Sequence, residues 1–98
     1  MRRIIFSDSA TNNVLRLRRF LAKENPIAAK KAAALIMEAA NRLIENPFIG
    51  KPVNNMPHYR DLLTRFGVGG YVLRYRVHLE IIYIVHVRHY REEGFRSQ

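Results

Sequence analysis

The spacing of hydrophobic positions changes along the chain, and each change predicts a different element. A short apolar run over residues 4–6 predicts a first strand. Ser7-Asp8-Ser9 then supplies the side chains typical of a helix N-cap. Beyond this cap, apolar residues recur at helical spacing, at Ala10, Val14, Leu17 and Leu21. The stripe predicts an α-helix with one face turned to a core.

A second helix follows with almost no connection. Asn25 is suited to capping it, and Pro26 fits the first helical position, where the missing N–H costs nothing. We expect this helix to cover residues 27–44. Its apolar positions are Ala29, Ala33, Ile36, Ala40 and Leu43, widened by Leu35, Met37 and Ile44. Because this arc covers about half of the helix circumference, we expect contacts with both the first helix and a sheet, as in an antiparallel helical hairpin.

The second half of the chain has the period of β-strands. Residues 48–58, after Asn46-Pro47, are expected to form an irregular connection. Strands are expected at 59–66, 71–77 and 81–90, joined by turns at Gly67-Val68-Gly69-Gly70 and His78-Leu79-Glu80. In the middle strand four apolar residues alternate with Val72, Arg74 and Arg76, so one sheet face should be apolar and the other basic.

Together these elements predict an α+β fold. An N-terminal short strand and an antiparallel helical hairpin should pack on a C-terminal antiparallel β-meander, in the order β-α-α-β-β-β. The length of 98 residues predicts a single domain over 1–98, with a flexible charged tail at 91–98.

Charge is the most informative part of the composition. The net charge is +9, and 13 of the 17 basic residues are arginines, which suit bidentate contacts to phosphate or carboxylate. The chain has no cysteine, which fits a reducing cytoplasm. No apolar run approaches the length of a membrane span, and the apolar stretch after Arg3 is too short for a signal peptide. We therefore expect a cytoplasmic protein that binds an acidic partner or a nucleic acid.

Several familiar kinds of site are not supported. The glycines at 67–70 precede a strand rather than the helix that a phosphate loop requires, so they predict a turn. His86 and His89 should point to opposite faces of a strand, and no cysteine or paired carboxylate completes a metal site. No serine lies in a nucleophile elbow. We expect neither a metal nor a cofactor.

Two basic surfaces remain as candidates. The first helix carries Arg16, Arg19 and Lys23 opposite its apolar stripe, either as a solvated face or as a docking surface for an acidic partner. On the sheet, the arginines that could converge are Arg60, Arg65, Arg74, Arg76 and Arg88.

Arg88-His89-Tyr90 has two readings. RNA cleavage through the 2′-hydroxyl needs a base, cations around the phosphorane and an acid, and Arg74, Arg88, His89 and Tyr90 could supply them. The same residues also fit the end of a strand, with arginines that keep an exposed face soluble and a histidine that serves as a hydrogen-bond partner. The residues alone leave both readings open.

Six short motifs, in this order, resemble the RelE/ParE superfamily of bacterial toxins, and specifically its ParE branch. They are Ala10 with Val14, Leu17 and Phe20; Asn25-Pro26-Ile27-Ala28-Ala29; Asn46-Pro47-Phe48-Ile49-Gly50-Lys51-Pro52; Arg60-Asp61-Leu62; Tyr71-Val72-Leu73-Arg74-Tyr75-Arg76-Val77; and Ile84-Val85-His86-Val87-Arg88-His89. The resemblance covers nearly the whole chain.

The resemblance implies a toxin held inactive by a co-expressed acidic antitoxin, ParD-like or similar, in a hetero-oligomer that contacts operator DNA only through the antitoxin. The ParE branch implies a poison that binds DNA gyrase without being a catalyst and that serves plasmid stabilisation. The residues expected to bind antitoxin or target are Arg16, Arg19, Lys23, Arg60, Arg65, Arg74, Arg76 and Arg88.

The RelE branch implies instead a ribosome-dependent mRNA endonuclease, with Arg74, Arg88, His89 and Tyr90 at its site. We favour gyrase binding, because eight residues follow Tyr90 and the central strands carry neither a lysine cluster nor a glutamate. A relative that binds its antitoxin and poisons nothing is a third possibility.

Overall fold

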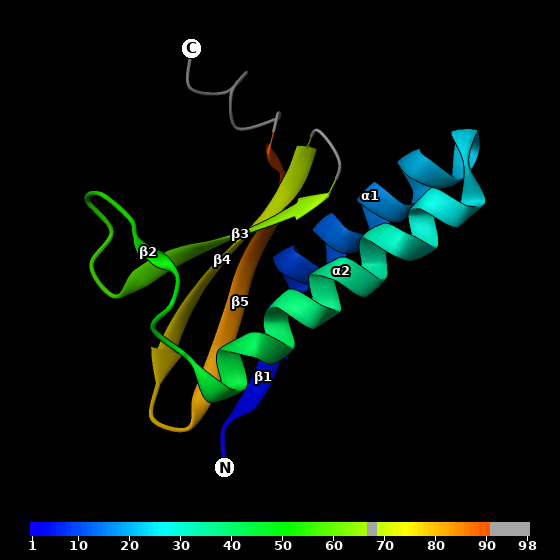
Figure 1. The fold of residues 1–98 in the computed structure, drawn as a ribbon. Helices are drawn as coiled ribbons and strands as arrows, with labels where there is room; N and C mark the ends of the chain where they lie inside the picture. Colours follow the sequence, from blue (N-terminus) through cyan, green and yellow to red (C-terminus); the bar gives the residue numbers. More distant parts are fainter. Residues whose placement is uncertain (67–68, 91–98) are drawn as a thin grey trace.

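A computed structural model describes residues 1–66 and 69–90, and it places two helices on one face of a five-stranded sheet (Figure 1). The elements are β1 (Arg3–Phe6), α1 (Asp8–Glu24), α2 (Pro26–Glu45), β2 (Lys51–Pro52), β3 (Tyr59–Phe66), β4 (Gly69–His78) and β5 (Ile81–His89). The predicted α+β fold is therefore confirmed. No described helix is long and apolar enough to cross a membrane. The expected tail at 91–98 and residues 67–68 of the expected turn lie outside the described residues.

The sheet has the order β1-β5-β4-β3-β2. Strands β3, β4 and β5 form the predicted antiparallel meander. β1 joins it in parallel beside β5, with Arg3 opposite Ile81, so the whole sheet is mixed. The prediction of an irregular connection was wrong at Lys51–Pro52, which pairs with β3. Two residues give no periodic signal, and Pro52 is tolerated because β2 is an edge strand.

Side-chain caps start both helices. The Ser7 hydroxyl accepts a hydrogen bond from the Ala10 N–H (3.0 Å), and the Asn25 carboxamide oxygen accepts from the Ile27 and Ala28 N–H groups (3.0 and 3.3 Å). Each cap satisfies donors that have no partner within a first helical turn. Both caps were predicted, and they explain how two helices can follow each other with only Asn25 between them.

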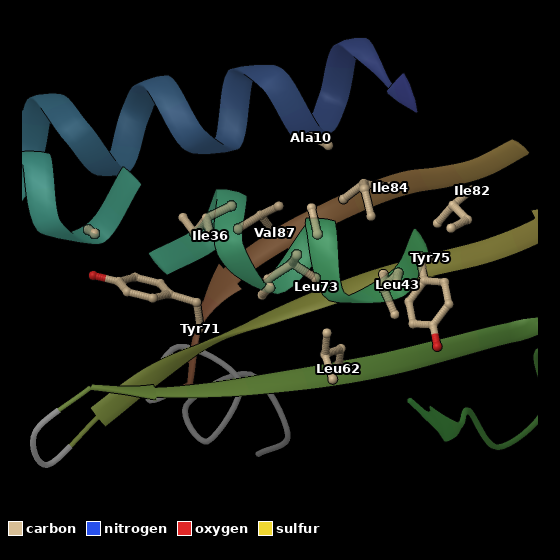
Figure 2. Close-up of a cluster of buried hydrophobic side chains, with 13 residues drawn as sticks. Ala10, Ile36, Leu43, Leu62, Tyr71, Leu73, Tyr75, Ile82, Ile84 and Val87 are labelled. Atoms are coloured by element: carbon tan, nitrogen blue, oxygen red, sulfur yellow. The ribbon is translucent and has the colours of Figure 1, made fainter. Parts of the chain in front are cut away.

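The core lies between α2 and the inner face of β4 and β5, with α1 closing one side (Figure 2). Its largest fully buried side chains are Tyr75, Ile36, Leu43, Leu73, Ile82, Ile84 and Val87. Of the expected helix stripes, Ala10 is buried and Leu17 packs against the core. Met37, expected in the apolar arc, is 50% exposed, and the small Ala32 and Ala39 are buried instead. Alanines at these positions allow α2 to approach the sheet closely.

β5 contains a register shift at Val85. The Cα partners run from Tyr75 and Ile84 directly to Arg74 and His86, so Val85 has no partner in β4. An extra residue of this kind exchanges the faces of all side chains that follow it. Ile84 faces the helices before the bulge, and Val87 faces them after it.

α1 binds the bulged segment through two polar side chains. The Ser7 hydroxyl donates to the Val85 carbonyl (3.2 Å), and the Val87 N–H donates to the Asn13 carboxamide oxygen (3.0 Å). Asn13 is one of the few buried polar residues. Asn13 therefore supplies the hydrogen-bond acceptor that the buried Val87 N–H needs.

Replacement of Asn13 by alanine should lower the free energy of unfolding by about 1–3 kcal/mol, because it leaves the buried Val87 N–H without an acceptor. The matched control is Asn12→Ala, an exposed neighbour with the same gain in helix propensity. Urea denaturation of both variants measures the difference. Equal stability of the two variants would contradict this role of Asn13.

Candidate functional site

The face of the sheet away from the helices carries four of the five predicted sheet arginines, Arg65, Arg74, Arg76 and Arg88. Two rows of neighbouring residues cross β3, β4 and β5: Asp61 with Arg74 and His86, and Tyr59 with Arg76 and Tyr83. Arg88 lies next to the first row, opposite Val72. We call Asp61, Arg74 and Arg88 the arginine cluster.

One carboxylate holds both arginines of this cluster. Arg74 binds Asp61 in a bidentate manner, with Nε–Oδ1 and Nη2–Oδ2 distances of 2.9 and 3.0 Å. Nη2 of Arg88 lies 3.5 Å from the same Oδ2, and Arg88 is only 8% exposed. Arg74 also directs Nη1 at Sδ of Met56 (3.3 Å). The cluster keeps one net positive charge, but both guanidinium groups already contact the Asp61 carboxylate.

The other sheet arginines are separate from this cluster. The guanidinium carbon of Arg76 lies 5.1 Å from the centre of the Tyr83 ring, a cation–π contact. Arg65 is exposed towards the end of β3. Arg60 pairs with the buried Tyr75 and donates to the carbonyl oxygens of Phe48 and Gly50. Arg60 therefore does not converge with Arg74 and Arg88, because it belongs to the opposite side of the β3 pleat.

The candidate residues for a nuclease site lie on different faces of the sheet. The His89 ring meets the ring of the buried Tyr71 edge-on, with centroids 5.5 Å apart. His89 therefore lies on the helix side, whereas Arg74 and Arg88 lie on the open side; Tyr90 is exposed beyond the strand. His86 and His89 do point to opposite faces, as predicted. Burial raises the pKa of the Tyr71 phenol, so this group stays protonated at neutral pH.

His86 is a β5 histidine on the same face as the arginine cluster, and the sequence pattern did not mark it as a site residue. As the Cα partner of Arg74 it lies on the row that also contains Asp61. Strict alternation from Ile84 would have placed it in the core. Only the bulge at Val85 turns it outward, and no motif in the sequence marks that bulge. Among the described residues, no group of three histidine, aspartate or glutamate side chains is arranged to hold a metal.

The second basic surface lies on the helical hairpin. Arg16, Arg19 and Lys23 of α1 are all exposed, as the sequence predicts. Next to them a groove of about 370 Å³ runs between α1 and α2. Its lining is Leu15, Arg18, Arg19, Ala22, Pro26, Ala29 and Lys30. Phe20 is 67% exposed on the same helix. We call these residues, together with Arg16 and Lys23, the hairpin surface, and its chemistry suits an acidic amphipathic segment.

The fold and its two cationic surfaces define a small basic α+β protein. The family model described as "ParE toxin of type II toxin-antitoxin system, parDE" matches residues 4–94. The chain therefore belongs to this toxin family, as the motifs predicted.

Individual proteins are also similar to this chain. Toxin RelE3 of Caulobacter vibrioides is 33% identical over 89 residues, which are 91% of this chain and 95% of the relative. A solved structure described as the chromosomal ParDE TA system from P. aeruginosa aligns with a TM-score of 0.71 at 23% identity. That alignment covers 89% of this chain and 94% of the other, and it shows the same fold.

Replacement of Asp61 by asparagine should lower the free energy of unfolding by about 2–3 kcal/mol, because two guanidinium groups, one of them buried, lose their shared carboxylate. The control is Glu80→Gln, which removes the same charge from an exposed ion pair with the N-terminus and should have little effect. Thermal denaturation followed by circular dichroism compares the two. A stable Asp61→Asn variant would show that the cluster does not support the fold.

Proposed function

We propose that this chain is a cytoplasmic toxin that inhibits DNA gyrase by binding it and that a co-expressed acidic antitoxin neutralises. The observation that carries the choice of a binding poison over a nuclease is the arginine cluster. Arg74 and Arg88, the cations that RNA cleavage would use, already share the carboxylate of Asp61. A phosphorane would have to compete with this carboxylate at short distance, which makes the pair poorly suited to stabilise developing negative charge.

The separation of the proton-transfer groups supports the same choice. General acid–base catalysis needs its groups within hydrogen-bond reach of one substrate. His89 contacts Tyr71 on the helix side of the sheet, away from Arg74 and Arg88. Binding without catalysis requires no such convergence, so an exposed surface with charge and apolar groups is sufficient.

An acidic antitoxin fits the charge of the hairpin surface. Arg16, Arg18, Arg19, Lys23 and Lys30 are exposed there, and Lys31 and Glu24 are exposed next to it. The groove floor is apolar, so an amphipathic segment could order on it as it binds. The similar P. aeruginosa structure is described as a toxin–antitoxin system, which supports a partner of this kind. We propose a hetero-oligomer that reaches operator DNA only through the antitoxin.

A ribosome-dependent mRNA endonuclease is the second candidate. It is favoured by the name of the similar Toxin RelE3 and by the presence of His86 on the same face as Arg74 and Arg88. In this reading Arg74, Arg88, His89 and Tyr90 would be the predicted site residues, with His86 as an additional group.

Induction of the toxin without antitoxin should give an early DNA-damage response while protein synthesis continues. A gyrase poison leaves broken DNA, whereas an mRNA endonuclease stops translation first. A damage reporter and pulse-labelled protein synthesis, followed in one culture, separate the two. Tyr90→Phe should remain as toxic as the wild type, since a poison that acts by binding needs no catalytic hydroxyl at the exposed Tyr90. An immediate stop in translation that Tyr90→Phe abolishes would establish the nuclease instead.

The affinity of the purified toxin for its antitoxin should fall as salt rises, because charge on the hairpin surface contributes to binding. Arg19→Glu should weaken binding and flatten this salt dependence, as measured by isothermal titration calorimetry at several salt concentrations. Arg42→Glu is the control, an equal charge reversal at an exposed position near the other end of α2. An affinity that does not depend on salt would place the main contribution in the apolar groove.

A further inference from the structure

The connection between α2 and β2 presents two large apolar side chains to solvent. Phe48 is 63% exposed and Ile49 is 47% exposed, although both follow directly on the buried Pro47. Exposed apolar residues in a mobile segment would be unremarkable. In this segment the backbone beneath them is firmly held.

Tyr75 holds the connection from within the core. Its hydroxyl donates to the Pro47 carbonyl (2.8 Å) and accepts from the Gly50 N–H (2.9 Å), and its side chain is fully buried. A Cβ at Gly50 would lie 2.7 Å from the Tyr75 ring and hydroxyl, so only glycine allows this approach. Burial raises the pKa of the Tyr75 phenol, which keeps the donated proton in place.

Arg60 holds the same segment from β3. One of its nitrogens, Nη1, donates to the carbonyl oxygens of Phe48 (3.1 Å) and Gly50 (2.8 Å). Its guanidinium carbon also lies 5.3 Å from the centre of the Phe48 ring. Phe48 and Ile49 are therefore displayed on a pre-organised loop, and a partner that binds them has little backbone entropy to remove.

A hollow of about 260 Å³ lies beside Phe48. Its lining is Phe48, Pro52, His58, Tyr59, Arg60 and Val77. Phe48, Pro52, Tyr59 and Val77 supply aromatic and aliphatic groups to this wall, His58 and Arg60 supply polar atoms, and none of the lining residues is a carboxylate. Such a site suits a large apolar side chain next to an acidic group. Exposed aromatic and aliphatic anchors favour a protein over a nucleic acid, whose contacts are dominated by phosphate.

The Phe48 loop and the hollow beside it are remote from the hairpin surface. The two lie at opposite ends of α2, which has 20 residues and is therefore about 30 Å long (Figure 1). The hairpin surface carries five basic residues and no acidic one, so it fits the acidic antitoxin. The loop with Phe48 and Ile49 has a different chemistry, with large exposed apolar side chains, and therefore suits a different partner.

We propose that Phe48, Ile49 and the adjacent hollow form the docking surface for the toxin's protein target. The target would insert one large apolar side chain, flanked by acidic residues, between Phe48 and Val77. This inference rests on the proposed function as a toxin that acts by binding, and it does not depend on whether gyrase is the target.

Phe48→Ser tests the proposal, with Met37→Ser as the control at another exposed apolar side chain, which belongs to neither the loop nor the hairpin surface. Each full-length variant is induced without antitoxin, and the surviving fraction is compared with that of the wild type. Phe48→Ser should raise survival by at least about tenfold, as expected for loss of a central aromatic anchor. Met37→Ser should stay toxic. Ile49→Ser provides a second variant on the loop, and thermal midpoints near that of the wild type show that all three fold.

A second measurement distinguishes the loop from an antitoxin site. The antitoxin is purified in complex with this chain and then separated from it. Its affinity for the Phe48→Ser variant should equal its affinity for the wild type. Loss of this affinity would overturn the proposal, because the loop would then belong to the antitoxin interface. Full toxicity of folded Phe48→Ser would overturn it too, while the toxin function itself stands. A wild-type chain that kills nothing would remove the proposed function and this inference together.

Discussion

The contact between α1 and the bulge in β5 determines which residues appear on each face of the sheet. Without the extra residue at Val85, Arg88 would point into the core and His89 would point outward. The bulge exposes backbone groups that a regular ladder would have paired. Ser7, the N-cap of α1, and Asn13 within α1 bind two of these groups, so the helix that covers the sheet also stabilises its irregularity. The placement of the arginine cluster thus depends on hydrogen bonds made on the opposite side of the sheet.

The arginine cluster shows how a strongly basic chain can form a stable sheet face. Arg74 and Arg88 lie on adjacent strands, and their mutual repulsion would oppose the fold if no anion lay between them. Asp61, on the third strand, supplies that anion through a bidentate contact with Arg74 and a longer one with Arg88. The hairpin surface, by contrast, carries Arg16, Arg18, Arg19, Lys23 and Lys30 and no acidic residue. Electrostatics therefore divides the molecule into a largely neutralised sheet centre and a hairpin surface with uncompensated charge.

The sequence predicted the features that depend on local periodicity, capping and hairpin pairing, and it missed those that depend on pairing between distant residues. The helical hairpin follows from the stripe of Ala10 and Leu17 and from the Asn25 cap, which are properties of neighbouring residues. The parallel addition of β1 to β5 and the bulge at Val85 come from contacts across more than 70 residues. The arginines were recognised as candidates, but their grouping was not. Alternation alone could not show that Arg60 turns inward to the Phe48 loop, or that His86 rather than His89 accompanies Arg74.

The motif around Gly50 illustrates how one buried side chain can serve both the fold and recognition. Tyr75 fills the core with its ring, while its hydroxyl fixes the carbonyl of Pro47 and the N–H of Gly50 at the surface. The glycine is required by the approach of that ring, and Arg60 binds the carbonyl of the same residue. Phe48 and Ile49 between these anchors cannot turn inward without breaking these contacts. Their exposure is therefore a consequence of the core itself, which gives a small protein a rigid apolar projection at little cost in conformational entropy.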